Sequence, residues 1–511
     1  WGFNAFDGII NIITKSPEEI KGTTIQVGGG EYGTLTASAI NAGKVKDFGY
    51  RLSIGHNQNA EWNDRNALAF RDNLFNILTE YALPSEAKLK VAGGLVDSNH
   101  FDGQFSEETL SSSRPAQGYA NVGYERPNFF IRAFWNYYSD QPNTRFTGLL
   151  APFLGPITYR GRESIATFAA NTYNVEAQHT IQLWPGHLFV YGANYRYNTL
   201  SSTFLNNFTT ENRLGLYIQD EYQVSNSVTL VAGARYDLDT FINPTVSPRI
   251  ALLYRPAPNH TFRLSWSVAY RPPTMVETNS ITNVNTVFSP VQITAAGNPN
   301  LAPEEINSYE ASYQGWYLNH RLQVRASVFY NHLSDLIKDT DVSPTFATRV
   351  NDPGSADIYG GETGIDFLAT KWLSGFANVS YQEISQTFTG RAQRGAPRFK
   401  WNAGLRGEWD NGLSGEVAYH YYGAATYAQG DAFTSFAQAG LIPSLDPRVG
   451  SYNLLNLRGG YKFWKQRASA GYLREAEVAI SAFNALNDKH QEHPLGETIG
   501  SRVMGWLTVR F

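Results

Sequence analysis

Polar and apolar residues alternate one by one through long stretches of this chain. Segment 262–271 places large apolar side chains at its even positions and mostly polar ones at its odd positions. Residues 321–331 alternate in the same way, and so do residues 502–511, which end on Phe511. A period of two predicts β-strands, because successive side chains of a strand point to opposite faces. One apolar and one mixed face predict strands that separate two different solvents.

The connections between these segments alternate between short and long. We count about 22 alternating segments between Lys21 and Phe511, and this even number fits an outer-membrane barrel. An arginine that faced lipid near the midplane would cost about 2–4 kcal/mol, so the polar faces are expected to line a lumen. The short turns are expected at 83–85, 126–128, 184–186, 256–259, 319–320 and 410–412, and the long connections at 99–116, 140–163, 272–305, 338–353, 423–450 and 486–501.

The predicted fold is therefore an all-β, transmembrane antiparallel β-barrel of about 22 strands, with short periplasmic turns and long extracellular loops. The barrel is expected to span residues 21–511, whereas residues 1–20 form a separate segment that contains a short apolar run. A large soluble all-β protein is the simpler alternative.

Composition supports a barrel in a membrane. No run approaches 18 consecutive apolar residues, so no transmembrane helix is expected. The 30 tyrosines, 30 phenylalanines and 11 tryptophans suit aromatic belts at two interfaces. The chain has no cysteine, which excludes disulfides and thiolate metal sites. Its net charge of −4 argues against binding to nucleic acid.

Four passages resemble the TonB-dependent receptor family of the bacterial outer membrane. Residues 1–15 resemble the closing stretch of that family's plug domain, so residues 1–20 are interpreted as the C-terminal remnant of a plug. Residues 217–237 resemble its mid-barrel hairpin, and 271–274 with 297–304 resemble its seventh extracellular loop. Residues 482–488, together with the terminal Phe511, resemble its last hairpin. These passages run from one end of the chain to the other.

The resemblance implies energised import across the outer membrane of a Gram-negative-type bacterium. Such receptors bind a scarce small molecule outside and are driven by the TonB–ExbB–ExbD complex, which grips a box near the receptor's N-terminus. Siderophores and other metal chelates are the best expectation for the substrate. Lipid and lipopolysaccharide would surround the barrel, and the barrel-assembly machinery would read Trp506, Val509 and Phe511 at its end.

Most of a plug and the TonB box are missing from the sequence, which begins at Trp1 without a signal peptide. They are expected upstream, although a separate plug chain and a plugless barrel are alternatives. Two rival functions follow: a passive porin-like channel, or the structural barrel of an outer-membrane assembly with a separate plug or lid chain.

Basic residues on the predicted lumen face are candidates for binding an anionic chelate, because arginine forks suit carboxylate and phosphate groups. The alternative is structural pairing with carboxylates such as Glu310 and Glu383. The candidates are Arg235, Arg263, Arg271, Arg321, Arg325, Arg398, Lys400 and Arg406.

The long connection 423–450 is rich in aromatic residues that would stack on a planar ligand, unless they serve a membrane belt or pack within the loop. Its candidate ligand-binding residues, with their neighbours, are Tyr421, Tyr422, Tyr427, Phe433, Phe436 and Arg448. His490 and His493 are too few to predict a metal site, and no cofactor is expected. No catalytic constellation is evident, so the chain is not expected to be an enzyme. The prolines of 271–274 and 297–304 are expected to fix loop architecture.

Overall fold

The structure is a computed structural model that describes residues 11–60, 69–106, 109–146, 154–159, 162–163, 166–205, 208–286, 292–343, 345–387, 396–427, 448–467, 473–494 and 498–511.

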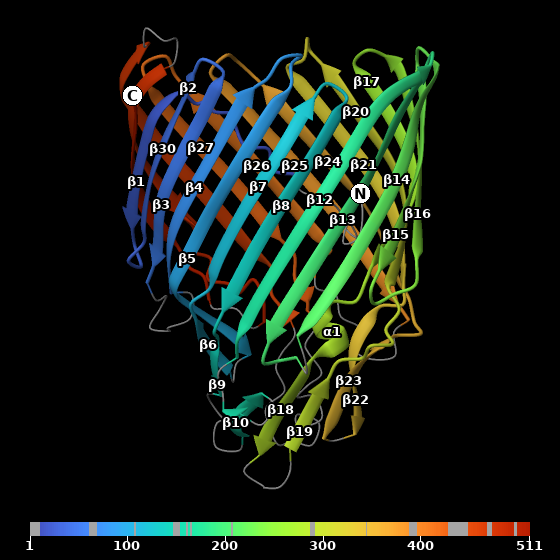
Figure 1. The fold of residues 1–511 in the computed structure, drawn as a ribbon. Helices are drawn as coiled ribbons and strands as arrows, with labels where there is room; N and C mark the ends of the chain where they lie inside the picture. The colour runs from blue at the N-terminus through green and yellow to red at the C-terminus, as the bar shows by residue number, and fades with distance from the viewer. Residues whose placement is uncertain are drawn as a thin grey trace.

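Twenty-two antiparallel strands of this described chain close into one barrel (Figure 1). Each strand pairs with the next along the ring, and the last strand pairs with the first, with Leu507 opposite Val27. The prediction of a 22-stranded antiparallel barrel is confirmed. The ring consists of β1 (Gly22–Gly30), β2 (Leu35–Val45), β3 (Phe48–Asn59), β4 (Phe70–Ala82), β5 (Lys88–Ser106), β7 (Ala116–Arg126), β8 (Phe129–Asp140), β12 (Phe168–Trp184), β13 (His187–Ser202), β14 (Thr209–Ser225), β15 (Val228–Asp239), β16 (Thr245–Ala257), β17 (His260–Arg271), β20 (Glu304–Tyr317), β21 (Leu322–Ser334), β24 (Ala356–Leu368), β25 (Leu373–Gln386), β26 (Phe399–Glu408), β27 (Leu413–Tyr422), β30 (Tyr452–Arg467), β31 (Leu473–Phe483) and β32 (Arg502–Arg510).

Short turns occupy one end of the barrel and long loops the other (Figure 1). All six predicted short turns join consecutive strands, and residues that tolerate positive φ occupy several of them, such as Asn128 at φ 69° and Gly186 at φ 82°. The predicted connection 99–116 is instead built mostly of strand. There β5 runs to Ser106 and is followed by β6 (Thr109–Ser113), which pairs with β9 (Asn143–Phe146). The alternation of polar and apolar residues does not predict these strands, because a strand that extends beyond the membrane needs no apolar face.

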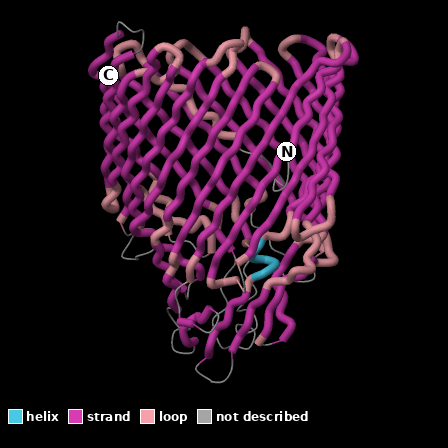
Figure 2. Tube along the Cα trace, viewed as in Figure 1, coloured by secondary structure: helices cyan, strands magenta, loops and turns pink. Residues whose placement is uncertain are grey.

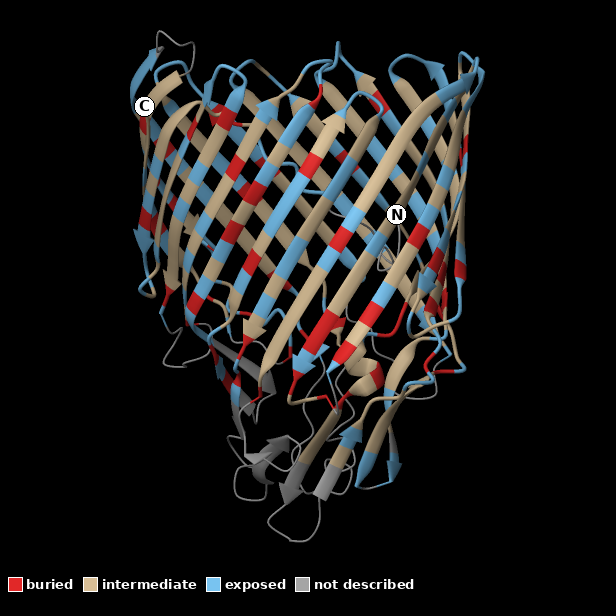
Figure 3. Cartoon of the chain, in the orientation of Figure 1, coloured by how far each residue is buried: buried red, intermediate tan, exposed pale blue. Residues whose placement is uncertain are grey.

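The outer surface of the wall is apolar, as the alternation predicts. The side chains of Leu264 and Val328 are 57% and 60% exposed, respectively. The residues two positions away along each strand point to the same side, and Phe262 and Tyr330 among them are also exposed. Exposed and less exposed residues alternate along the strands (Figure 3). The opposite parity carries most of the charged residues, which therefore line the inner wall.

The seam between β1 and β32 is closed by an aromatic ring lying over a glycine. Gly28 and Trp506 are register partners. A Cβ at Gly28 would lie 2.4 Å from Cε3 of Trp506, so only glycine leaves room for the indole. Phe511 extends the seam through backbone hydrogen bonds with Thr23 in both directions, at 2.7 and 2.9 Å.

Gly28→Ala is expected to destabilise the closed barrel by about 1–3 kcal/mol, because the indole must leave its position or the strands must separate. The measurement is the urea midpoint of the folded, heat-modifiable electrophoretic band. Gly505→Ala is the matched control on the same seam, since a Cβ there would meet no atom within 4 Å. Equal midpoints for the two variants would contradict this account of the seam.

Three loops at the long-loop end join in a separate six-stranded sheet, called here the loop sheet. They are loop 4 (residues 141–167), loop 7 (272–303) and loop 8 (335–355). The strand order is β11 (Arg162–Glu163), β10 (Leu154–Tyr159), β18 (Ile281–Thr286), β19 (Gln292–Ala296), β23 (Phe346–Asn351) and β22 (Ile337–Ser343). The central contact between loops 7 and 8 is parallel, with Ala295 opposite Ala347. The two-stranded pair β28 (Ala425–Thr426) and β29 (Arg448–Val449) lies elsewhere, in loop 10 (423–451).

Loop 7 also contains α1 (Met275–Asn279), the one helix of the described residues (Figure 2). Thr274 caps it: its hydroxyl accepts a hydrogen bond from the Glu277 backbone, and the Glu277 carboxylate accepts one from the Thr274 backbone. Beneath loops 7 and 8, Ile306, Leu333 and Ala356 form a small apolar core. No described helix has the length and apolarity needed to cross a membrane.

Candidate functional site

A cavity of about 780 Å³ lies against the inner wall between β17 and β27. Seven of its lining residues are successive register partners, so they form one row across the wall. The row is Arg263, Ser312, Ser327, Glu362, Ser380, Lys400 and Tyr422. At one end, Arg263 stands close to the short-turn start of β17, and at the other Tyr422 is the last residue of β27, at the long-loop end. The row therefore leads from the barrel mouth toward the opposite end.

Carboxylates accompany most of the cations in this region. Arg263 lies 3.8 Å from Glu310, and Arg325 pairs with Asp366. Lys400 makes no ion pair with any residue that the structure describes. Arg263 and Arg325 therefore form structural ion pairs, as the alternative interpretation expects, whereas the ammonium group of Lys400 remains available to an anion.

Aromatic rings continue the row into the mouth. Tyr422 stacks on Tyr452, with ring centroids 4.9 Å apart, and Tyr452 stacks on His490 at 4.1 Å. Beside them, Tyr427 meets His493 edge-on at 4.8 Å. Burial and then the nearby Glu492 carboxylate raise the pKa of Tyr427, which keeps its hydroxyl as a donor. We call Tyr422, Tyr427, Tyr452, His490 and His493 the mouth cluster. Tyr452 and His490 are buried against their neighbours, so the more exposed rings of Tyr422, Tyr427 and His493 are the ones that can meet a ring-bearing ligand.

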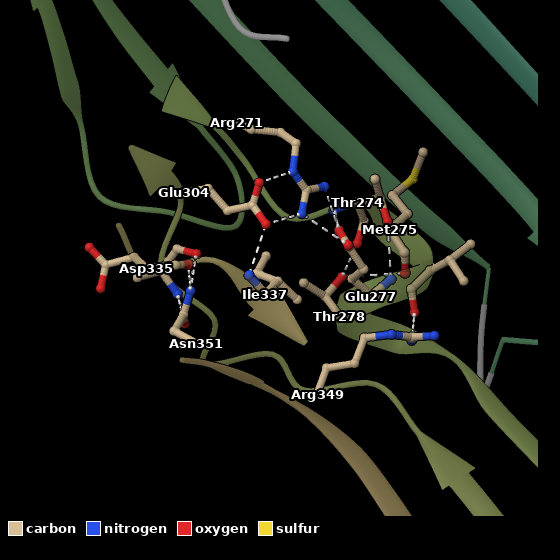
Figure 4. Close-up of polar contacts among 12 residues, drawn as sticks. Arg271, Thr274, Met275, Glu277, Thr278, Glu304, Asp335, Ile337, Arg349 and Asn351 are labelled. Carbon is tan, nitrogen blue, oxygen red and sulfur yellow. Dashed lines mark hydrogen bonds and ion pairs between the residues drawn. The ribbon is translucent and has the colours of Figure 1, made fainter. Parts of the chain in front are cut away.

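Arg271 ties together the base of loop 7 (Figure 4). It is the last residue of β17 and the register partner of Glu304, the first residue of β20. Its guanidinium donates to both oxygens of Glu304, at 2.7 Å from Nη2 to Oε1, and to both oxygens of Glu277, each at 3.2 Å. Glu304 Oε1 also accepts from the backbone of Ile337, at 2.8 Å, which brings in loop 8. We call Arg271, Glu277, Glu304 and Ile337 the loop clasp.

Further hydrogen bonds hold loop 8 against loop 7. Arg349 donates to the carbonyl of Val276 at 3.1 Å and to the hydroxyl of Ser280 at 2.9 Å. Asn351 donates to the carbonyl oxygen of Ala302 in loop 7, at 3.0 Å, and to that of Asp335 within loop 8, at 2.6 Å. The two loops therefore share one polar framework.

Loop 7 is expected to loosen in acid. Burial opposes ionisation of Glu277, but hydrogen bonds from Arg271 and Thr274 outweigh it and lower the pKa below the ordinary 4.5. A depressed pKa stabilises the loop above about pH 4.5, and that stabilisation is lost as pH falls through the lower, folded-state value. Hydrogen exchange of loop 7 amides between pH 6 and pH 3 should reveal the loss, and Glu277→Gln should remove this pH dependence. A loop equally protected at both ends of the range would contradict the assignment.

The remaining candidate residues lie apart from the cavity or in other pairings. Arg321 lies at the short-turn end and donates to the carbonyls of Leu368 and Ala369. Arg398, just before β26, pairs with Glu383 at 2.8 Å. Arg235 pairs with Asp237, and Arg406 with Glu408. Arg448 lies in β29, opposite Thr426, while Phe433 and Phe436 fall outside the described residues.

Inspection of the sequence missed Tyr452, Glu277 and Glu304. Tyr452 opens the strand after the long connection 423–450, and its pairing with Tyr422 follows only when those strands are recognised as neighbours. Glu277 stands three residues after Thr274, a spacing typical of a helix cap that was available as a signal. Among the described residues, no group of three or more His, Asp or Glu side chains is placed to hold a metal ion.

A family model described as "TonB dependent receptor-like, beta-barrel" matches residues 47–484. A comparison with curated proteins gives no match.

Solved structures share the fold at low sequence identity. The FrpB iron transporter from Neisseria meningitidis is 15% identical with a TM-score of 0.74, over 98% of this chain and 82% of that one. The siderophore receptor PirA from Pseudomonas aeruginosa is 15% identical with a TM-score of 0.73, over 100% and 84%. The Serratia marcescens hemophore receptor HasR, solved with its hemophore and heme, is 14% identical with a TM-score of 0.73, over 98% and 82%.

Proposed function

This chain belongs to the TonB-dependent receptor family of Gram-negative outer-membrane β-barrels, and from that premise we propose that it takes up a metal chelate, with a siderophore as the leading candidate. The long-loop end is then extracellular and the short-turn end periplasmic. Energy would come from the TonB–ExbB–ExbD complex, as the family implies. The similar structures include an iron transporter, a siderophore receptor and a hemophore receptor, which supports the same substrate class.

The observation that carries the proposal is the continuity between the mouth cluster and the inner-wall cavity. Tyr422 belongs to both, since it stacks on Tyr452 and lines the cavity beside Lys400. A ligand with a flat ring and a negative charge would find a stacking surface at the mouth and an ammonium group on the next strand. Siderophore chelates of iron combine these two properties.

The test is uptake of ⁵⁵Fe by cells that lack their own receptors and express this receptor from its natural gene, together with any sequence that precedes Trp1. The probes are ferric complexes of a catecholate and of a hydroxamate, and heme labelled with ⁵⁵Fe. We expect saturable uptake of at least one probe that stops when TonB is deleted. Lys400→Gln and Tyr422→Ala should weaken binding of that probe, whereas Arg321→Gln, at the far end of the barrel, should not.

Other outcomes would redirect the assignment. Non-saturable entry that persists without TonB would favour the porin-like channel. No uptake of any probe, together with a lid or plug protein that co-purifies with the barrel, would favour the structural barrel. Either result would overturn the proposal.

A further inference from the structure

A group of basic and aromatic side chains lies on the outer face at the short-turn end, far from the mouth. Arg126 ends β7, and its guanidinium carbon lies 5.6 Å from the ring centroid of Phe129, the first residue of β8. Phe129 is the register partner of His179, and their rings are 6.3 Å apart. Nδ1 of His179 lies 2.9 Å from the hydroxyl of Tyr191 on the next strand. Four strands thus contribute to one group.

A second histidine continues the group along β13. The ring of His187 stacks on Tyr222, with centroids 4.1 Å apart and planes 9° from parallel. Its Nδ1 donates to the carboxylate of Asp220 at 2.7 Å. His187 and Tyr191 have the same parity on β13, so the two histidine sites share a face. We call Arg126, Phe129, His179, His187, Tyr191 and Tyr222 the interface patch.

This patch faces the membrane at the level of the periplasmic headgroups. Tyr191 is 44% exposed on the lipid-facing side of the wall, and Val175, of the same parity on β12 as His179, is 47% exposed. Arg126 and His187 flank the short turns at 127–128 and 185–186. Tyrosine and tryptophan are common at this level, where one part of the ring is apolar and the other wet. The guanidinium of Arg126 adds a permanent positive charge to this part of the belt.

Some hydrogen-bonding groups of the interface patch have no partner among the described residues and face outward. Nδ1 of His179 can accept from the Tyr191 hydroxyl, which leaves its Nε2–H to donate to a group outside the protein, whereas Nδ1 of His187 donates to Asp220. Arg126 is exposed and makes no ion pair with any described residue. Its five donors and fixed fork suit the oxygens of a phosphate. Asp220 is hydrogen-bonded to His187 and makes no ion pair with Arg126, so the charge of Arg126 remains for the ligand.

We propose that the interface patch binds the phosphate headgroup of an anionic phospholipid from the periplasmic leaflet. Arg126 contacts the phosphate, Nε2–H of His179 supplies a further hydrogen bond, and the aromatic rings pack along the glycerol and upper acyl region. The inference needs only the membrane position of the barrel and is independent of what the receptor transports.

The experiment is native mass spectrometry of the purified full chain with equal amounts of dioleoylphosphatidylglycerol and dioleoylphosphatidylethanolamine. We expect selective retention of phosphatidylglycerol, and an occupancy about fivefold lower in Arg126→Gln, the effect of one basic residue near a lipid surface. His179→Gln should also lower it. His260→Gln is the matched control, because Nδ1 of His260 makes the same kind of contact with Tyr313, at 2.8 Å, outside the patch.

Three results would overturn the proposal: equal retention of both lipids by the wild type, unchanged occupancy in Arg126→Gln, or an equal loss in His260→Gln. Millimolar inorganic phosphate provides a further arm. The bound lipid should resist it, whereas displacement by free phosphate would show a simple anion site and would also overturn the lipid assignment. Heat-modifiable mobility checks folding, and if Arg126→Gln fails to fold, His179→Gln carries the test.

Discussion

Glu304→Gln is expected to release loops 7 and 8 together. The side chain of Glu304 is 8% exposed and accepts hydrogen bonds from Arg271 and from the Ile337 backbone, so an amide in its place turns one acceptor into a donor. Weakening a buried pair of this kind costs about 2–3 kcal/mol, since Glu277 still holds part of the arginine charge. Protection of loop 7 and loop 8 amides from hydrogen exchange should fall by roughly 30–150-fold.

Hydrogen exchange with peptide-level resolution distinguishes this result from general destabilisation. The strands β17 and β20 below the clasp should keep their protection. Asp366→Asn is the matched control, because it makes the same carboxylate-to-amide change in an exposed pair with Arg325, where the expected effect is below about 1 kcal/mol. If loop 8 stays protected in Glu304→Gln while loop 7 opens, the clasp does not join the two loops.

Val328→Arg is expected to prevent stable insertion of the barrel. Val328 lies at the middle of β21 and is 60% exposed on the lipid-facing side. An arginine near the bilayer midplane costs about 2–4 kcal/mol on this face. The measurement is the folded fraction in lipid vesicles across a urea titration, followed by electrophoretic mobility without heating.

Ser327→Arg supplies the control one residue away. Ser327 lines the inner-wall cavity, so an arginine there can stay hydrated and should change the midpoint little. A reversed order of the two variants would mean that the faces of β21 are assigned the wrong way round.

The barrel was predictable because each strand repeats the same local signal. Alternation predicts a strand wherever one face meets lipid. The number of strands, which is even, and the positions of the turns follow from these segments. Where the wall extends beyond the membrane that signal disappears, and the strands of 99–116 were accordingly expected as a loop. The loop sheet could not be predicted from the sequence for a related reason: its strands are short, and they pair between separate loops.

The candidate site was predictable by residue type but not by partner. Arg271 was predicted to bind ligand because of its charge. The strand register instead places it opposite Glu304, although the whole of loop 7 separates the two residues in the chain. Tyr422 and Tyr427 were recognised from the aromatic content of their loop. Their contacts with Tyr452 and His493 depend on how β27, β30 and the last loop meet in space.

The parallel contact between β19 and β23 imposes an order on assembly. Strands β20 and β21 lie between these two segments in the chain, so the contact forms only when that hairpin is in place and both loops reach the same side of the membrane. Contacts that close long stretches of chain are slow to form. Completion of the loop sheet would then be a late event in biogenesis, and an antibody that recognises the joined strands would report fully assembled receptors on living cells.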